Sequence, residues 1–107
     1  MTRWIGMADV RPLDDNDLLG AATGAYVSVV GDADDEASFL ALVVRELKAL
    51  QFEVLSLEDA EPLEERRARA SLPDILNGAI AEISDQSPLA HGSFHAYSSG
   101  QTAQRIH

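Results

Sequence analysis

The sequence predicts an α+β domain in which two main helices pack on one face of a mixed sheet of three or four strands. Two observations predict it. Apolar residues recur with a helical period in two segments, and β-branched or aromatic residues fill short runs bounded by glycine or proline. The elements follow the order β-β-α-β-α-β. Residues 1–98 are expected to form one domain, followed by a polar tail over residues 99–107.

The first two strands are predicted at Trp4–Val10 and Ala25–Val30. Pro12 is expected to end the first, because proline cannot donate a hydrogen bond to a neighbouring strand. The second is apolar on both faces except at Ser28, which is typical of a central strand. Gly31 is expected to end it.

The clearest helix is predicted to begin at Asp34 or Asp35 and to end near Leu50. Acids in its first turn and Lys48 in its last turn suit the helix dipole. A strand at Phe52–Leu57 follows so closely that a right-handed β-α-β crossover is expected, with its two strands adjacent or nearly so. The apolar stripe of the helix consists of Phe39, Leu40, Val43, Val44, Leu47 and Leu50.

The rest of the chain predicts a second helix and a last strand. Residues 64–70 favour one or two exposed helical turns. Ser71 and Asp74 form a capping box that is expected to open an amphipathic helix ending near Asp85. The last strand is predicted at Gly92–Ser98.

Composition excludes several classes of function. The chain has no cysteine, so disulfides, zinc–thiolate sites and a cysteine nucleophile are ruled out. No apolar run exceeds the six residues of Phe39–Val44, so neither a signal peptide nor a membrane helix is expected, and the expected location is the cytoplasm. The net charge of -10 disfavours nucleic acid and favours a basic protein partner.

Two acidic segments are the predicted binding surface for that partner. The alternative interpretation is that both segments are loops that only confer solubility. Crowding of like charges predicts raised pKa values for these carboxylates. The candidate residues are Asp14, Asp15, Asp17, Glu58, Asp59, Glu61, Glu64 and Glu65.

No metal ion or cofactor is expected. The acids from Asp32 to Glu36 lead directly into a helix, so they are better explained as a helix cap than as a calcium loop. His91 and His95 would lie about 13 Å apart on a strand, too far to share one zinc ion. Gly20 and Gly24 precede a strand, whereas a phosphate-binding loop follows one.

A second interpretation is a small ligand-binding or hydrolytic domain. Its site would lie on the sheet face left open by the helices, with His95 as general base beside Trp4, Glu58 and Tyr97. It requires a concave pocket that contains His95. If that face were apolar, it would favour a homodimer instead.

Four stretches resemble a group of small, acidic, uncharacterised bacterial proteins of the toxin-immunity type. They are residues 4–12 (WIGMADVRP), 24–30 (GAYVSVV), 52–63 (FEVLSLEDAEPL) and 92–97 (GSFHAY). The resemblance implies a protein of the immunity or antitoxin type, and it implies no catalytic residue. Because the chain is acidic, the expected target is a basic toxin such as a nuclease, whose active site is built to hold polyanions. A non-enzymatic protein-binding module is therefore the leading hypothesis.

Overall fold

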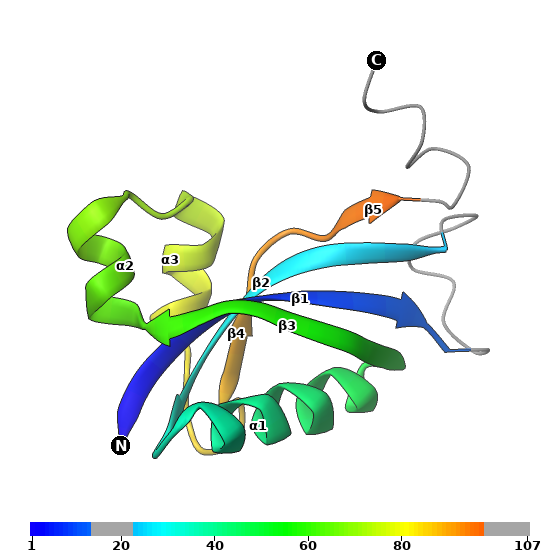
Figure 1. Ribbon diagram of the computed structural model, residues 1–107, viewed down its shortest axis with the longest axis horizontal. Coiled ribbons are helices and arrows are strands. Elements are labelled where there is room, and N and C mark those ends of the chain that lie inside the picture. The colour runs from blue at the N-terminus through cyan, green and yellow to red at the C-terminus, as the bar shows by residue number, and fades with distance from the viewer. Residues whose placement is uncertain (14–22, 98–107) are drawn as a thin grey trace.

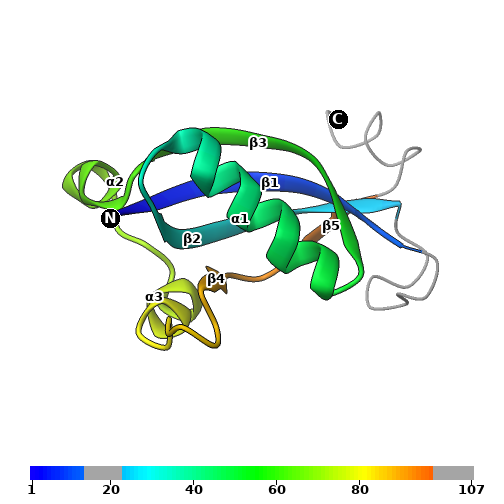
Figure 2. The same cartoon turned by 90° about the horizontal axis from the view of Figure 1, so that it is seen from below.

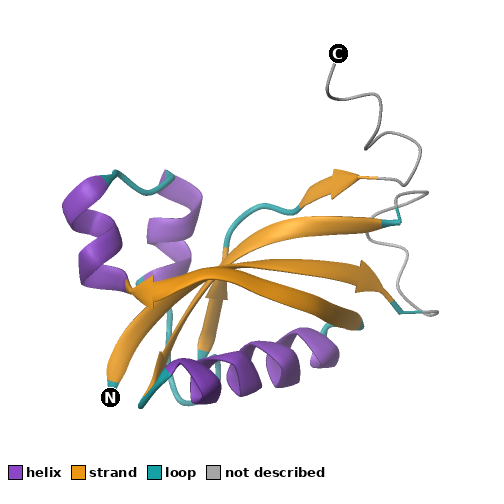
Figure 3. Cartoon of the chain, viewed as in Figure 1, coloured by secondary structure: helices purple, strands orange, loops and turns teal. Residues whose placement is uncertain are grey.

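The structure, a computed structural model, describes residues 1–13 and 23–97. The candidate acids at 14, 15 and 17 and the predicted tail therefore lie outside the described residues. The described elements form the predicted α+β fold, a sheet packed against helices (Figure 3). They are β1 (Thr2–Pro12), β2 (Gly24–Ala33), α1 (Glu36–Ala49), β3 (Phe52–Pro62), α2 (Leu63–Arg69), α3 (Asp74–Ile80), β4 (Leu89–His91) and β5 (His95–Tyr97).

The sheet has the strand order β3-β1-β2, and both β4 and β5 pair with the other side of β2. Each pairing between the described strands is antiparallel, so the sheet is antiparallel rather than mixed. The reason is that β1 lies between β2 and β3. These two strands run in the same direction, as the predicted β-α-β crossover requires, but they do not pair.

One face of the sheet packs against α1. Successive side chains of a strand project to opposite faces, so alternate residues of β1 and β2 point toward the helix. Figure 2 shows α1 crossing the strands on this side. Helix and strands together enclose the larger core. Its buried residues are Ala8, Val10, Ala25, Val27, Val29, Ala33, Phe39, Val43, Leu47 and Phe52.

The other predicted main helix does not lie beside α1, which corrects the placement of both helices on one face. Ile5 and Val30 pair with each other in register and point away from α1. Because both are apolar, they require cover on the opposite side of the sheet. Leu63 of α2 and Leu76 and Ile80 of α3 supply that cover. In Figure 1, α2 and α3 accordingly lie at one end, across the sheet from α1.

The predicted apolar stripe of α1 is too wide. Phe39, Val43 and Leu47 are buried, but Leu40 and Val44 are each 41% exposed and Leu50 is 49% exposed. A helix that lies across a sheet buries the stripe beneath it, while its flank stays open at the edge of the sheet. Leu40 and Val44 are one turn apart on that flank.

Three strands are longer than predicted. β1 begins at Thr2, and β3 continues to Pro62 past Asp59, whose positive φ of 55° lies at an irregularity in the pairing with β1. β2 runs through Gly31 to Ala33. A Cβ at Gly31 would lie 2.6 Å from Leu42 Cδ2, so this glycine lets α1 approach the sheet rather than ending the strand.

The C-terminal part departs most from the prediction. The capping box at Ser71 is wrong, because the N-cap of α3 is Pro73 and no side chain caps it. Ser71 lies two residues before this cap, outside the first turn that it would have to reach. α3 ends at Ile80, earlier than predicted. The predicted last strand is replaced by two strands of three residues, β4 and β5, separated by residues 92–94.

Candidate binding surface

The sheet face opposite α1 is covered only at one end by the described helices. Beyond Ile5 and Val30, the alternation of the strands places polar and aromatic side chains on this side. We call this surface the open face. Its residues are Met7, Asp9, Arg11, Tyr26, Ser28, Glu53, Ser56, Glu58, His95 and Tyr97.

Two tyrosines and an aspartate lie together on the open face, at the end of the sheet where β5 pairs with the start of β2. The Tyr97 hydroxyl donates a hydrogen bond of 2.5 Å to Asp9 Oδ1. The rings of Tyr97 and Tyr26 pack with their centroids 5.3 Å apart. The hydrogen bond to Asp9, followed by burial, raises the pKa of Tyr97 to about 12 from its ordinary 10.0. Both rings are thus held in place on a surface that the described helices leave uncovered.

Gly24 is the reason that Tyr97 can reach Asp9. Gly24 and Tyr97 are partners in the pairing of β2 with β5. A Cβ at Gly24 would lie 2.6 Å from both Cζ and Oη of Tyr97 and 2.8 Å from the carbonyl oxygen of Val10. The tyrosine therefore lies directly over the glycine and spans β2, so that a residue of β5 binds a residue of β1.

Glu61 does not belong to the binding surface in the way the sequence predicted. Arg66 Nε lies 2.5 Å from Glu61 Oε2, and Arg69 donates to both carboxylate oxygens at 2.6 and 2.7 Å. These arginines lower the pKa of Glu61 to about 2 from its ordinary 4.5, Arg69 having the larger effect. The expectation of a raised pKa is wrong at this residue, because the arginines of α2 fold back onto it.

The other four described candidate acids gather at one corner. Glu58 and Asp59 lie near the end of β3, and Glu64 and Glu65 lie in the first turn of α2. All four side chains are exposed. Within residues 1–13 and 23–97, none of their carboxylates forms a salt bridge. Glu58, which also belongs to the open face, connects this corner to it.

The structure brings together only some of the residues predicted for the alternative ligand-binding or hydrolytic site. His95 lines a hollow of about 150 Å³ between the sheet and the start of α3, together with Ser28, Ser93 and apolar residues of α3. Tyr97 lies on the same strand and the same face. Trp4 is on the opposite face, its ring centroid 6.3 Å from that of Phe39. Glu58 is on β3, separated from β2 by β1.

The acidic run from Asp32 to Glu36 serves the fold. Asp35 caps α1, and its Oδ1 accepts a hydrogen bond of 2.8 Å from the Ser38 amide, which confirms the helix-cap interpretation. Arg3 Nε donates to Asp32 Oδ1 over 2.8 Å and lowers the pKa of that carboxyl. The described residues contain no group of three potential metal ligands.

Sequence reasoning missed Asp9 as a site residue. The available signal was that Asp9 is an acid in the middle of a predicted strand. Met7 and Arg11, two residues away on either side, lie on the same face of that strand. Such a position can accept a hydrogen bond from a neighbouring strand, but the sequence does not show that the donor is the hydroxyl of residue 97.

Comparison with protein-family models, with curated proteins and with solved structures finds no match to this chain. Within the part of the chain that the structure describes, no helix has the length and apolar character needed to cross a membrane.

Proposed function

We propose that the protein is a non-enzymatic, acidic protein-binding module and that the open face is its recognition surface. In its concrete form, the proposal is an immunity or antitoxin-type inhibitor that acts in the cytoplasm on a basic toxin such as a nuclease. The observation that carries the proposal is the packed pair Tyr26 and Tyr97, fixed by Asp9 on a sheet face that the described helices leave uncovered.

Tyrosines of this kind suit a protein interface. Tyrosine is enriched among the residues that contribute most to binding, because its ring buries a large area and its hydroxyl retains a polar partner. Tyr97 is already held by Asp9 and Tyr26, so little side-chain freedom would be lost on binding. Met7 lies two residues before Asp9 on the same face of β1, as an adaptable apolar contact.

The charge supports a basic partner. The chain carries -10, and four exposed carboxylates, which form no salt bridge within the described residues, lie on or near the open face. An acidic surface attracts a basic protein over a distance of several ångströms and speeds its association. The active site of a nuclease is built to hold polyanions, so an acidic protein can match its potential and block it.

A second copy of this chain, forming a homodimer, is the alternative partner for the open face. Two copies that meet there would bring Asp9 and Glu58 of one subunit toward the same acids of the other. Like charges that meet across an interface cost free energy, which favours a basic protein over a second copy. A monomeric mass in light scattering at high concentration agrees with this choice, and a stable dimer contradicts it.

The test uses two variants with the same change in charge. Met7→Lys places a cation on the open face, and Gln86→Lys places one on an exposed loop between α3 and β4. The tagged protein is used to recover its partner from the producing organism, and the purified pair is then titrated. Met7→Lys should weaken binding by roughly tenfold or more while Gln86→Lys should not. Equal affinities for both variants, or an acidic partner, would contradict the proposal.

A second candidate function, a small ligand-binding or hydrolytic site, is supported by the hollow that His95 lines. At about 150 Å³ it is smaller than the several hundred Å³ typical of ligand pockets. Two serines and a histidine line it, but no carboxylate does. Assays with activated esters would support this function if His95→Gln removed an activity that the wild type showed. No activity in the wild type would contradict hydrolysis.

A further inference from the structure

We propose that a groove between α1 and the free edge of β3 binds an extended segment of the partner protein, in which apolar and basic side chains alternate. This inference rests on the proposed function for the basic character of the partner. It concerns the edge of β3, which shares only Glu53 and Glu58 with the open face, and the variants that locate the groove change no residue of the open face.

The edge of β3 offers backbone groups to an added strand. Among the described strands, β3 pairs only with β1, and so it lies at the edge of the sheet. The Leu13 amide donates a hydrogen bond to the Gln51 carbonyl over 2.9 Å, so the backbone of residue 51 faces β1. Every second residue then bonds to β1, and the backbone groups of Phe52 and Val54 point to the free edge. An extended peptide can pair with such groups.

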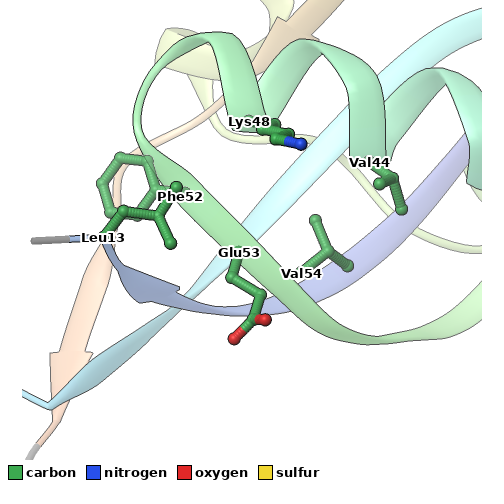
Figure 4. A pocket seen from close by; sticks show the side chains of 6 residues that line it. All are labelled: Leu13, Val44, Lys48, Phe52, Glu53 and Val54. Atoms are coloured by element: carbon green, nitrogen blue, oxygen red, sulfur yellow. The ribbon is translucent and has the colours of Figure 1, made fainter.

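The groove beside this edge is apolar at its centre. It has a volume of about 470 Å³ and is lined by Leu13, Val44, Lys48, Phe52, Glu53 and Val54. In Figure 4, Val44 of α1 and Val54 of β3 face one another, and the Glu53 carboxylate points away from them. Leu40, one turn before Val44, extends the apolar surface along the helix. The face of an added strand toward α1 would therefore carry apolar side chains.

The other face of the added strand would meet acids. Glu53 and Glu58 of β3 project to the side of the sheet opposite α1, and Asp59 is exposed beside them. Arg11 is paired with Glu53, whereas Glu58 has no salt bridge within the described residues. Side chains directly across from one another on neighbouring strands interact, so lysine or arginine is favoured at these positions. Apolar and basic residues would thus alternate along the segment.

The acids also argue against a second copy of this chain as the occupant. If two β3 strands paired antiparallel about Glu53, this residue would lie opposite its own copy. If they paired about Leu55 and Ser56, Glu53 would lie opposite Glu58. Like charges in directly opposed positions destabilise a sheet, and the chain as a whole carries -10. A basic segment of another protein meets neither obstacle.

The irregularities of β3 limit the length of the segment. The register with β1 shifts at Leu55 and again around Asp59 and Ala60. Such bulges interrupt the regular pairing of an edge. Two short undisturbed stretches remain, residues 52–54 and residues 56–58, and all three residues of the first line the groove. The pairing is therefore expected to be short, with the apolar groove selecting the segment.

The test is a titration of the isotope-labelled full chain with the peptide acetyl-Lys-Val-Lys-Val-Lys-Val-amide. A peptide of the same composition, with its valines and its lysines in separate blocks, controls for attraction by charge alone. The proposal predicts tighter binding of the alternating peptide, with NMR shifts at the Phe52 and Val54 amides. Equal binding of the two peptides, or no shift at these amides, would overturn it.

Matched variants locate the peptide. Val44→Asp should weaken binding of the alternating peptide by roughly tenfold, because it places a carboxylate in the apolar groove. Ile75→Asp changes another exposed apolar residue, on α3, and should leave the affinity unchanged. Unchanged affinity in Val44→Asp would overturn the proposal. Met7→Lys tests the open face separately, so the two proposals can fail independently.

Discussion

Tyr97 on β5 is bound to Asp9 on β1 although the two residues are 88 positions apart and β2 lies between their strands. β5 is only three residues long, and among the described strands it pairs with β2 alone. The bond to Asp9 and the contact with Tyr26 are therefore expected to hold this end of the sheet together.

Tyr97→Phe should lower the free energy of unfolding by about 1–2 kcal/mol, because the hydrogen bond has a charged acceptor in a partly buried position. Tyr26→Phe removes a hydroxyl from the same ring pair and leaves the bond to Asp9 in place, so its effect should be close to zero. Urea unfolding of both variants measures the difference. Equal stabilities would show that the bond does not hold β5.

The titration of Tyr97 can be observed by itself. The chain has two tyrosines, so Tyr26→Phe leaves Tyr97 as the only one. Ultraviolet absorbance should then give a pKa near 12, well above the ordinary 10.0. A raised folded pKa stabilises the folded state below pH 10, and this contribution is lost as the pH rises from 10 toward 12. A pKa of 10 in the folded protein would mean that Asp9 does not bind the hydroxyl.

Two glycine substitutions should have opposite effects. Gly24→Ala would place a Cβ 2.6 Å from the Tyr97 ring and should destabilise the protein by roughly 1–3 kcal/mol. Gly78→Ala in α3 meets nothing within 4 Å and should stabilise the helix by about 0.5–1 kcal/mol. Unfolding curves give both values. A Gly24→Ala protein as stable as the wild type would contradict the close packing of Tyr97 on β2.

The ion pairs of Glu61 should make the free energy of unfolding fall in acid. Its folded pKa of about 2 lies below its ordinary 4.5, so its contribution is present above pH 4.5 and disappears as the pH falls toward 2. Glu61→Gln should therefore have a lower free energy of unfolding than the wild type at neutral pH. This difference between the two proteins should narrow as the pH falls from 4.5 toward 2. Glu64→Gln removes an exposed acid that forms no salt bridge within the described residues, and it should show no such difference. A difference independent of pH would contradict the ion pairs with Arg66 and Arg69.

How well the sequence predicts an element depends on how far apart in the sequence its interacting residues lie. α1 and its Asp35 cap were predictable because helical period and capping are local. The side on which α3 packs was not, because it depends on Ile5 and Val30 forming an apolar pair across two strands. Likewise, the exposure of Leu40 and Val44 follows from where α1 lies on the sheet.

The candidate site shows the same division. The acidic corner at Glu58 and Glu64 was predictable, since its members are neighbours in sequence. The neutralisation of Glu61 was not, because nothing local requires Arg66 and Arg69 to turn back toward β3. Trp4 was wrongly grouped with His95 because the two lie on opposite faces of a sheet whose pairing could not be foreseen.

The most direct measurement of the central claim is cross-linking in the producing organism, with a photoreactive amino acid at Met7 on the open face or at Gln86 on the remote loop. Because the open face is the proposed recognition surface, irradiation should join position 7, and not position 86, to a basic protein. Absence of a product at position 7, or the same product from both positions, would contradict the assignment of this face as the binding surface.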